Sequence, residues 1–414
     1  MGFNYSLHNN LINLISQSKG LINKKNSARM GALRAFELGL RPNKEEWKYT
    51  TLSWDQRSIC LPGAAATPDT KWIPVPSSGY YLIVYNGVLL VEQSRVWDGA
   101  QINQIKRSDK SGPNLVNRSI CPETYFSSLN TALSEGVQIE ISKNINAPVE
   151  IIYAYDSERP ALCQTRIAIQ LNENVDIQTV ERTFFKQEKS FHVSNDIVEV
   201  IMKKNSSWKN FLFEDRGEQN QNIRSYYITQ HKSSQSAFYD FSFGEGLYRK
   251  NLNILLLEEF STTSLYSISL LYSGHVDHKI SLKHAAPNCS SYQIYKGVYG
   301  GTSTGVFNGG VIVDRIAQKT DAFQQNNNII ISDGATVHAK PQLEIFADDV
   351  SCSHGCTVGQ IDEQTLFYIQ SRGIGKKEAQ KMLLVAFFND VISKINSTSI
   401  SEEVLKSLYK ILKK

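Results

Sequence analysis

The chain has 414 residues, of which 41% are hydrophobic, 10% aromatic and 20% charged, a composition that excludes a disordered or low-complexity chain. The formal net charge is only +4, with 44 basic and 40 acidic residues and no long run of lysine or arginine, which argues against nucleic-acid binding. No stretch approaches the roughly 18 consecutive apolar residues of a membrane helix, so we expect no membrane association.

The N-terminal part of the chain predicts helices. Apolar residues between Leu11 and Ile22 form a broken helical stripe, and the segment 28–40 is rich in alanine, leucine and arginine, which are good helix formers. Trp47 and Tyr49 follow, and we expect their aromatic rings to pack against the rest of the protein. We therefore predict an N-terminal helical region over residues 1–75.

Further along the chain the pattern becomes that of short strands. Tyr80–Val91 is rich in β-branched and aromatic residues, and Asn86-Gly87 inside it predicts a hairpin turn. A helix is expected at Tyr125–Leu133. From Val137 onward strands recur at intervals of about 10 to 14 residues. The clearest examples are Val149–Tyr155, Thr165–Leu171, Val175–Val180, Asp196–Met202, Trp208–Glu214, Ala237–Phe243, Leu252–Leu257, Ser264–Leu271 and His278–Leu282.

This succession of strands favours a parallel β-helix, a solenoid, over a sandwich or a barrel. The run is too long for one ordinary sandwich, and after Val137 the only strong hairpin signal is Asn308-Gly309-Gly310. The polar segment Gln324–Asn328 resembles the side-chain ladders that stacked coils can satisfy. We predict a mainly β protein whose β-helix core spans residues 76–360.

The C-terminal region, residues 361–414, predicts three helices. They cover 363–372, ended by Gly373, then 376–395 and 401–412. The second is apolar around most of its circumference, so we expect it to be buried on two sides. Burial inside a compact knot of three helices and coverage by a partner protein both remain open.

The glycine-rich stretch Gly297–Gly305 superficially suggests a phosphate-binding loop. Such a loop needs Lys-Ser/Thr after its last glycine, and here Val306-Phe307 follows. We therefore expect tight turns between solenoid strands, and any use of ATP must come from another chain. Three dispersed histidines are assigned no role; they are His275, His278 and His284.

Six cysteines occur, four of them isolated in the sequence: Cys60, Cys121, Cys163 and Cys289, besides Cys352 and Cys356. This is not a disulfide framework, and the N-terminus does not resemble a signal peptide, so a cytoplasmic location is expected. The Met1-Gly2 start fits the loose myristoylation pattern, which short sequences often match by chance.

The segment Cys352-Ser353-His354-Gly355-Cys356 is the best candidate for chemistry. If the strand predicted at Gln342–Val350 continues, Cys352, His354 and Cys356 lie on one face, about 7 Å apart between neighbours. Thiolate and imidazole suit iron, iron–sulfur clusters, zinc or copper. Three ligands in a row do not close a tetrahedral cage, so such a site is open, transient or completed by another chain. Two small packed cysteines and a satisfied histidine are the alternative.

Residues 340–355, KPQLEIFADDVSCSHG, closely resemble the SufD family of the SUF iron–sulfur cluster assembly system. The resemblance continues through Thr357–Glu363, Leu366-Phe367-Tyr368 and Ser371–Ile374. The N-terminal motif Glu45–Thr50 and the segment His284–Pro287 also look like that family. The resemblance covers most of the chain and is weakest over about residues 55 to 200.

The resemblance implies a non-enzymatic scaffold that presents ligands for a transient iron–sulfur cluster at a subunit interface. A SufB-like paralogue would form a heterodimer through the β-helix, and Cys352 and His354 carry over as cluster ligands. Cys356 departs from the family pattern, so it is either an extra ligand or packing. A SufC-like ABC-type ATPase would dock on the C-terminal helices. The residues concerned are Leu366, Phe367, Tyr368, Arg372, Gly373 and Ile374.

Two functions from other classes stay open. A stand-alone metal-binding β-solenoid would hold metal without partners. A polysaccharide-acting β-helix enzyme would need clustered carboxylates on one sheet face, which are not apparent. Cluster type, flavin use and the formation of homodimers are also left open by the sequence.

Overall fold

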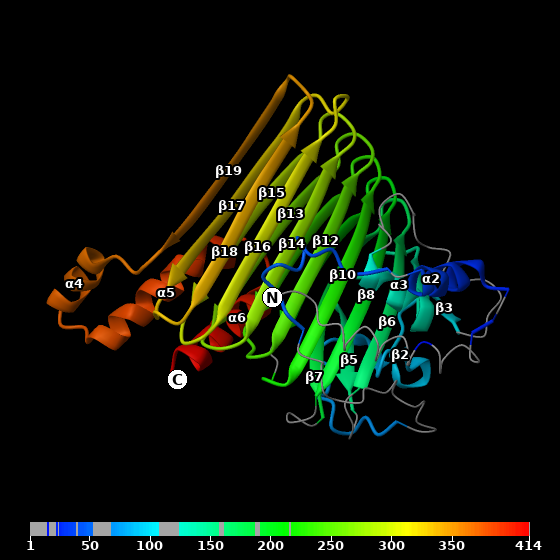
Figure 1. Ribbon diagram of the computed structural model, residues 1–414, viewed down its shortest axis with the longest axis horizontal. Coiled ribbons are helices and arrows are strands. Elements are labelled where there is room, and N and C mark those ends of the chain that lie inside the picture. The colour runs from blue at the N-terminus through cyan, green and yellow to red at the C-terminus, as the bar shows by residue number, and fades with distance from the viewer. Residues whose placement is uncertain are drawn as a thin grey trace.

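The computed structural model of the protein describes residues 15, 22–23, 25–38, 40–52, 68–106, 124–156, 161–186, 191–214 and 217–413. Within these residues the strands form a parallel β-helix with two facing sheets, sheet A with nine strands and sheet B with ten (Figure 1). From β4 onward successive strands alternate between the sheets, so each coil adds one strand to each. The predicted fold class, a mainly β parallel solenoid with helices near the ends, is confirmed.

The strands are parallel within both sheets except at the N-terminal end, where β1 pairs with β2 and β3 with β4 in antiparallel fashion. Sheet B contains β1 (Tyr80–Tyr85), β2 (Val88–Leu89), β5 (Val149–Tyr155), β7 (Asp176–Phe185), β9 (Ser207–Glu214), β11 (Gln235–Ser242), β13 (Thr262–Leu271), β15 (Ser290–Tyr299), β17 (Thr320–Ile330) and β19 (Val350–Gly359). Sheet A contains β3 (Ala100–Ile105), β4 (Glu135–Ile141), β6 (Ala161–Leu171), β8 (His192–Met202), β10 (Asn220–Gln230), β12 (Leu247–Leu256), β14 (His275–His284), β16 (Thr304–Val313) and β18 (Thr336–Ile345).

One corner of the solenoid repeats a residue in the left-handed backbone region. These residues are Asn174, Asn205, Ser233, Phe260, Asn288 and Lys319, at intervals of 27 to 31 residues. The backbone N–H of Asn205 donates to the carbonyl of Lys232 at 3.0 Å, and Ser233 and Asn288 donate to the following coil in the same way. The left-handed residue therefore turns the chain and links neighbouring coils.

The lumen between the sheets is packed with apolar side chains and neutralised charges. Arg224 is fully buried and lies 3.0 Å from Glu214 and 3.2 Å from Asp196. Further along, the Nζ atom of Lys250 lies 2.6 Å from Asp240. Because buried charges are costly unless they are paired, these clusters specify the inward register of their strands.

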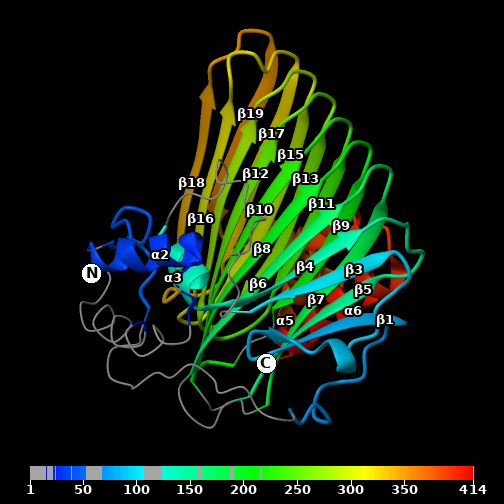
Figure 2. The ribbon, with the colours of Figure 1, turned by 90° about the vertical axis from the view of Figure 1, so that its right-hand side faces the viewer.

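Helices cover the outer faces of both sheets. Helices α2 (Ser27–Glu37) and α3 (Tyr125–Leu133) pack on sheet A, where α3 contacts β6 and β8. Helices α5 (Lys376–Ile392) and α6 (Thr398–Leu412) pack on sheet B. Figure 2 shows the two pairs on opposite sides of the solenoid. None of the helices in the described part of the chain is long and apolar enough to span a membrane.

The helix after Gly375, for which we expect burial on two sides, keeps an exposed side within the described chain. Helix α5 buries Leu384, Phe388 and Val391 against sheet B and α6, and Ala379 is buried elsewhere on the helix, while Met382 is 48% exposed. A sheet face supplies one flat surface, so one stripe is enough to hold the helix. The short helix α4 (Glu363–Ser371) contacts α5 and projects beyond β19 (Figure 1).

Residues 40–52, which we term the strap, run across the outer face of sheet A. Trp47 is buried between Phe126 of α3 and the guanidinium of Arg249 on β12. Thr50 bonds Asp277 on β14. The packing predicted for Trp47 is therefore confirmed, and the strap connects coils that lie far apart in the sequence.

Several sequence expectations need correction. The strand predicted at Gln342–Val350 is in fact the end of β18, a turn at 346–349 and the start of β19. The turns predicted at Gly297–Gly305 are confined to residues 300–303, because Gly297 lies in β15 and Gly305 in β16. The predicted hairpin at Asn86-Gly87 and the helix Tyr125–Leu133 are confirmed.

Some expectations fall outside the described residues. These are the Met1-Gly2 pattern, Cys60, Cys121 and most of the stripe from Leu11. Ile15 and Ile22 of that stripe are described and are buried in the cluster beneath α2 and α3.

Candidate functional site at the open end of the solenoid

The C-terminal end of the solenoid leaves one free strand edge on each sheet. β18 pairs only with β16, and β19 pairs only with β17 (Figure 1). The backbone groups along the other edges of β18 and β19 have no strand neighbour among the described residues. The mouth of the lumen at this end is therefore bounded by two edge strands.

β19 carries Cys352, His354 and Cys356 on its inward face. The register pairs them with Ala322, Gln324 and Asn326 of β17. These three β17 residues are buried in the lumen, and Cys352 packs against the lumen core. As the alternation of side chains predicts, the cysteines and the histidine share one face.

Cys352 and Cys356 have different surroundings. Cys352 is half-buried and, like Leu343 of β18, packs against the lumen core, and burial raises the pKa of its thiol. Cys356 is exposed, and its Sγ atom lies 3.7 Å from the Oδ1 atom of Asn326. Burial also raises the pKa of the Cys356 thiol.

A column of buried amides stands behind His354 and Cys356. The Nε2 atom of Gln324 donates to Oε1 of Gln293 at 3.1 Å, and the Nδ2 atom of Asn328 donates to Oδ1 of Asn326 at 2.8 Å. The Oε1 atom of Gln324 has no hydrogen-bond partner, although the residue is 1% exposed. The polar ladder predicted at Gln324–Asn328 thus exists, and its inward members face the mouth of the lumen.

Glycines in the neighbouring strands make room for this arrangement. A Cβ atom on Gly305 would lie 2.3 Å from the ring of Tyr299, and one on Gly309 would lie 2.7 Å from Nε2 of Gln324. The glycines therefore admit large lumen side chains rather than a phosphate, which agrees with the sequence reasoning against a phosphate-binding loop.

The thiol and imidazole groups of β19 suit soft metal ions, but they do not by themselves complete a metal site. Among the described residues, no group of three or more His, Cys, Asp or Glu side chains is close enough to hold a metal ion. His354 and Cys356 are exposed at the mouth, so external ligands can reach them. Imidazole and thiolate favour iron and iron–sulfur clusters, and the remaining ligands have to come from outside this strand.

The six residues expected to dock an ATPase lie on and just after α4. Phe367 and Tyr368 are 73% and 59% exposed, whereas Leu366 is buried. An Nη atom of Arg372 donates to the hydroxyl of Tyr368 at 2.9 Å. Gly373 has a φ of 86°, a left-handed conformation suited to glycine, and Ile374 is half-buried. The helix thus presents two aromatic rings outward.

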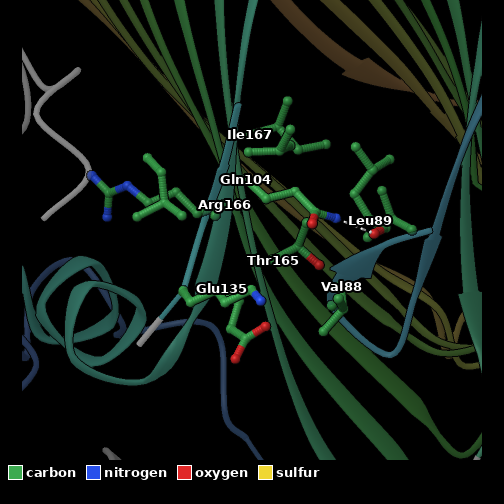
Figure 3. A pocket seen from close by; sticks show the side chains of 13 residues that line it. Val88, Leu89, Gln104, Glu135, Thr165, Arg166 and Ile167 are labelled. Atoms are coloured by element: carbon green, nitrogen blue, oxygen red, sulfur yellow. Dashed lines mark hydrogen bonds between the residues drawn. The ribbon is translucent and has the colours of Figure 1, made fainter. Parts of the chain in front are cut away.

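A cavity lies at the N-terminal end of the lumen, and none of the described residues that line it is a cysteine or a histidine. Figure 3 shows Gln104, whose amide donates to the carbonyl of Leu89 at 2.7 Å, among the lining side chains. Arg166 points away from it and pairs with Glu199. We assign no site to this cavity.

Sequence reasoning missed the buried group formed by Lys250, Asp240 and His278, having given His278 no role. The Nε2 atom of His278 lies 2.9 Å from Asp240, on the side of the lumen that leads to Tyr295. The signal was available in the alternation of the predicted strands, which places Asp240 and His278 on inward positions.

Comparison with known proteins shows the family of this chain. The family model described as "SUF system FeS cluster assembly, SufBD core domain" matches residues 153–387. The chain is 31% identical over 252 residues to "Protein ABCI7, chloroplastic" of Arabidopsis thaliana, covering 60% of this chain and 53% of that relative. The chain therefore spans about half the length of the Arabidopsis protein.

Two further relatives are bacterial. An iron–sulfur cluster assembly SufBD family protein of Synechocystis is 25% identical over 411 residues, covering 92% of this chain and 88% of the relative. The iron–sulfur cluster assembly protein SufD of Escherichia coli is 38% identical over 168 residues, covering 40% of each chain.

Proposed function

Because the chain belongs to the SufBD family of iron–sulfur cluster assembly proteins, we propose that it acts as a SufD-like scaffold subunit rather than as an enzyme. The observation that carries the proposal is the placement of His354, Cys352 and Cys356 at the lumen mouth, between two free strand edges. The iron–sulfur cluster is the cargo of this site. Deprotonated thiolate and neutral imidazole would bind it while a partner supplies the remaining ligands.

The partner in this proposal is a SufB-like paralogue with its own β-helix. A second solenoid placed against β18 and β19 would continue both sheets and hydrogen-bond their free edges. Phe346 and Val358, which are 58% and 47% exposed near these edges, would be covered by such a neighbour. The same edges would serve a homodimer, which is the alternative pairing.

A SufC-like ATPase would dock on the C-terminal helices. Phe367 and Tyr368 offer aromatic surface on α4, the kind of side chain that anchors protein interfaces. Helix α5 continues from α4 onto sheet B, where Asp390 lies 2.7 Å from Lys296 of β15. Movement of the ATPase could thereby be transmitted through α4 and α5 to the C-terminal coils of the solenoid. The cytoplasmic location stays a prediction, and the Arabidopsis relative is named chloroplastic.

Anaerobic cluster reconstitution tests the proposal. The full chain is assembled with and without its SufB-like and SufC-like partners, and bound iron and visible absorbance are measured. We expect a cluster only in the complex, and its loss in His354→Ala with the complex still assembled. Ser353→Ala changes the neighbouring residue on the opposite face of β19 and should form a cluster normally.

Two results would contradict the scaffold. A stable cluster or metal ion on the isolated chain would favour the stand-alone metal-binding protein. Cluster formation in the complex that ignores His354→Ala, Cys352→Ser and Cys356→Ser alike would return the segment to ordinary packing.

A further inference from the structure

We propose that the metal-binding pair of this chain is His354 with Cys356, and that Cys352 lies outside it. This inference rests on the proposed function, since it assigns ligands within the same site. The family resemblance points to Cys352 as the thiol, so the inference concerns a feature in which this chain departs from that pattern.

The spacing of the two thiols prevents them from sharing one ion. Cys352 and Cys356 are four residues apart on one straight strand, which separates their Cα atoms by about 13 Å. Two sulfur ligands of one ion lie within about 5 Å of each other, because each metal–sulfur bond is about 2.3 Å long. His354 lies between the two cysteines and can join either of them.

The opposite sheet covers one thiol and leaves the other open. β18 runs into the turn at 346–349 and β19 returns from it, so inward positions face each other across the mouth in pairs. Leu343 faces Cys352, and both pack against the lumen core. Counted from the turn, the inward position of β18 that corresponds to Cys356 is Ala339, which has a small side chain, and Cys356 is exposed. An incoming ion therefore reaches Cys356 more readily.

The buried amides lie behind His354 and Cys356. Gln324, which pairs with His354 in the register, is 1% exposed and has an Oε1 atom with no hydrogen-bond partner. That oxygen can accept a hydrogen bond from one N–H of the imidazole and leave the other ring nitrogen free for metal. The Oδ1 atom of Asn326 lies 3.7 Å from the Cys356 sulfur and can accept from its S–H group, whereas the residue behind Cys352 is Ala322. Side-chain amides thus stand behind His354 and Cys356, while the Cys352 thiol has only a backbone hydrogen bond at Ala322.

Alkylation of the full-length chain measures the accessibility of Cys352 and of Cys356 separately. The chain is treated with iodoacetamide under anaerobic conditions, with and without excess Co²⁺ as a probe for soft divalent metal, and peptides are analysed by mass spectrometry. We expect Co²⁺ to slow alkylation of Cys356 about tenfold or more and that of Cys352 less than about twofold. His354→Ala should abolish the protection. Protection of Cys352 instead, of both thiols equally, or of neither overturns the inference.

A matched pair of variants tests the amide support. Gln324→Leu should raise the Co²⁺ concentration for half-protection about tenfold, while Gln325→Leu, on the outer face of the same strand, should leave it unchanged. Equal behaviour of the two variants overturns the role of Gln324. Cluster reconstitution in the complex distinguishes failure of this ligand pair from failure of the scaffold function. If Cys352→Ser loses the cluster and Cys356→Ser keeps it, the pair is refuted and the scaffold function stands. If His354→Ala still forms the cluster, the scaffold function itself is refuted.

Discussion

The ring of Tyr49 stacks on the imidazole of His338, with ring centroids 4.0 Å apart and planes inclined by 14°. Tyr49 belongs to the strap, and His338 lies on the outer face of β18, the edge strand of sheet A. The strap therefore reaches from helix α3 at one end of the sheet to the strand that borders the candidate site.

The two aromatic residues of the strap should contribute unequally to stability. Trp47→Ala removes a buried ring from between Phe126 and Arg249, so we expect a loss of about 3–5 kcal/mol in the free energy of unfolding. Tyr49 is 43% exposed, and Tyr49→Ala should cost about 1 kcal/mol or less. Urea denaturation measures both. Equal losses of stability in the two variants would mean that Tyr49 holds the strap as strongly as Trp47 does.

Two adjacent glycines of β16 provide a sharp comparison. A Cβ atom on Gly309 would lie 2.6 Å from Phe307 and 2.7 Å from Gln324, whereas one on Gly310 would meet nothing closer than 3.6 Å. Gly309→Ala should therefore cost about 1–3 kcal/mol of stability by overpacking, and Gly310→Ala should be nearly neutral. Because Gln324 pairs with His354 in the register, Gly309→Ala should also weaken Co²⁺ protection of Cys356. Thermal denaturation of both variants measures the stability change, and the alkylation assay measures the Co²⁺ protection. If Gly309→Ala does not change stability, the close packing around Gly309 is disproved.

Buried histidines should make the protein less stable in mild acid. Burial lowers the pKa of His284 and of His192 to about 4. An unfolded histidine titrates near 6.5, so between these values the unfolded chain binds more protons and stability rises with pH. The stabilisation is complete above about pH 6.5 and is lost as pH falls toward 4, by up to about 3 kcal/mol for each histidine. Urea titrations at a series of pH values should show that the free energy of unfolding depends less steeply on pH in His284→Asn. An unchanged slope would mean that His284 does not cause the loss of stability in acid.

The buried group around Asp240 predicts a pH-dependent substitution effect. Burial by itself would raise the pKa of Asp240, but Lys250 and His278 hold it below its usual range. Lys250→Met leaves the carboxylate with His278 alone and should cost about 3–5 kcal/mol near pH 8. In this variant the pKa of His278 rises, so its charged pairing is present in mild acid and lost as pH increases.

The deficit relative to the unmodified chain should therefore be smaller near pH 6 than near pH 8. Chemical denaturation at both pH values checks this expectation. A deficit independent of pH would show that His278 does not take over the role of Lys250.

Much of the fold could be predicted because the apolar alternation of single strands is local. Strand β5 and helix α3 have the bounds predicted from sequence. Strand β10 was absent from the predicted strands because its inward positions include Asn222 and Arg224, whose polar side chains break the apolar pattern. The coil length was also readable, since Asn174, Asn205 and Asn288 mark the same corner.

The candidate site could be predicted only within one strand. Alternation places Cys352, His354 and Cys356 on one face, and nothing more than their spacing is needed for that conclusion. The cover over Cys352 and the amides behind His354 come from Leu343 and Gln324, on other strands. The position of Gln324 depends on the register between strands thirty residues apart, and that of Leu343 on the turn at 346–349, and pattern analysis of a single strand supplies neither.

The antiparallel strands at the N-terminal end have a consequence for assembly. Because β2 and β3 end their sheets in antiparallel pairs, the two ends of the described solenoid are unlike, and only the C-terminal end presents a free parallel strand in both sheets. When two solenoids meet through their C-terminal ends, the free edges of β18 and β19 in both of them become paired. The product is a closed pair, because the antiparallel edge strands β2 and β3 at the other end of each described solenoid do not match the parallel edges that have already paired.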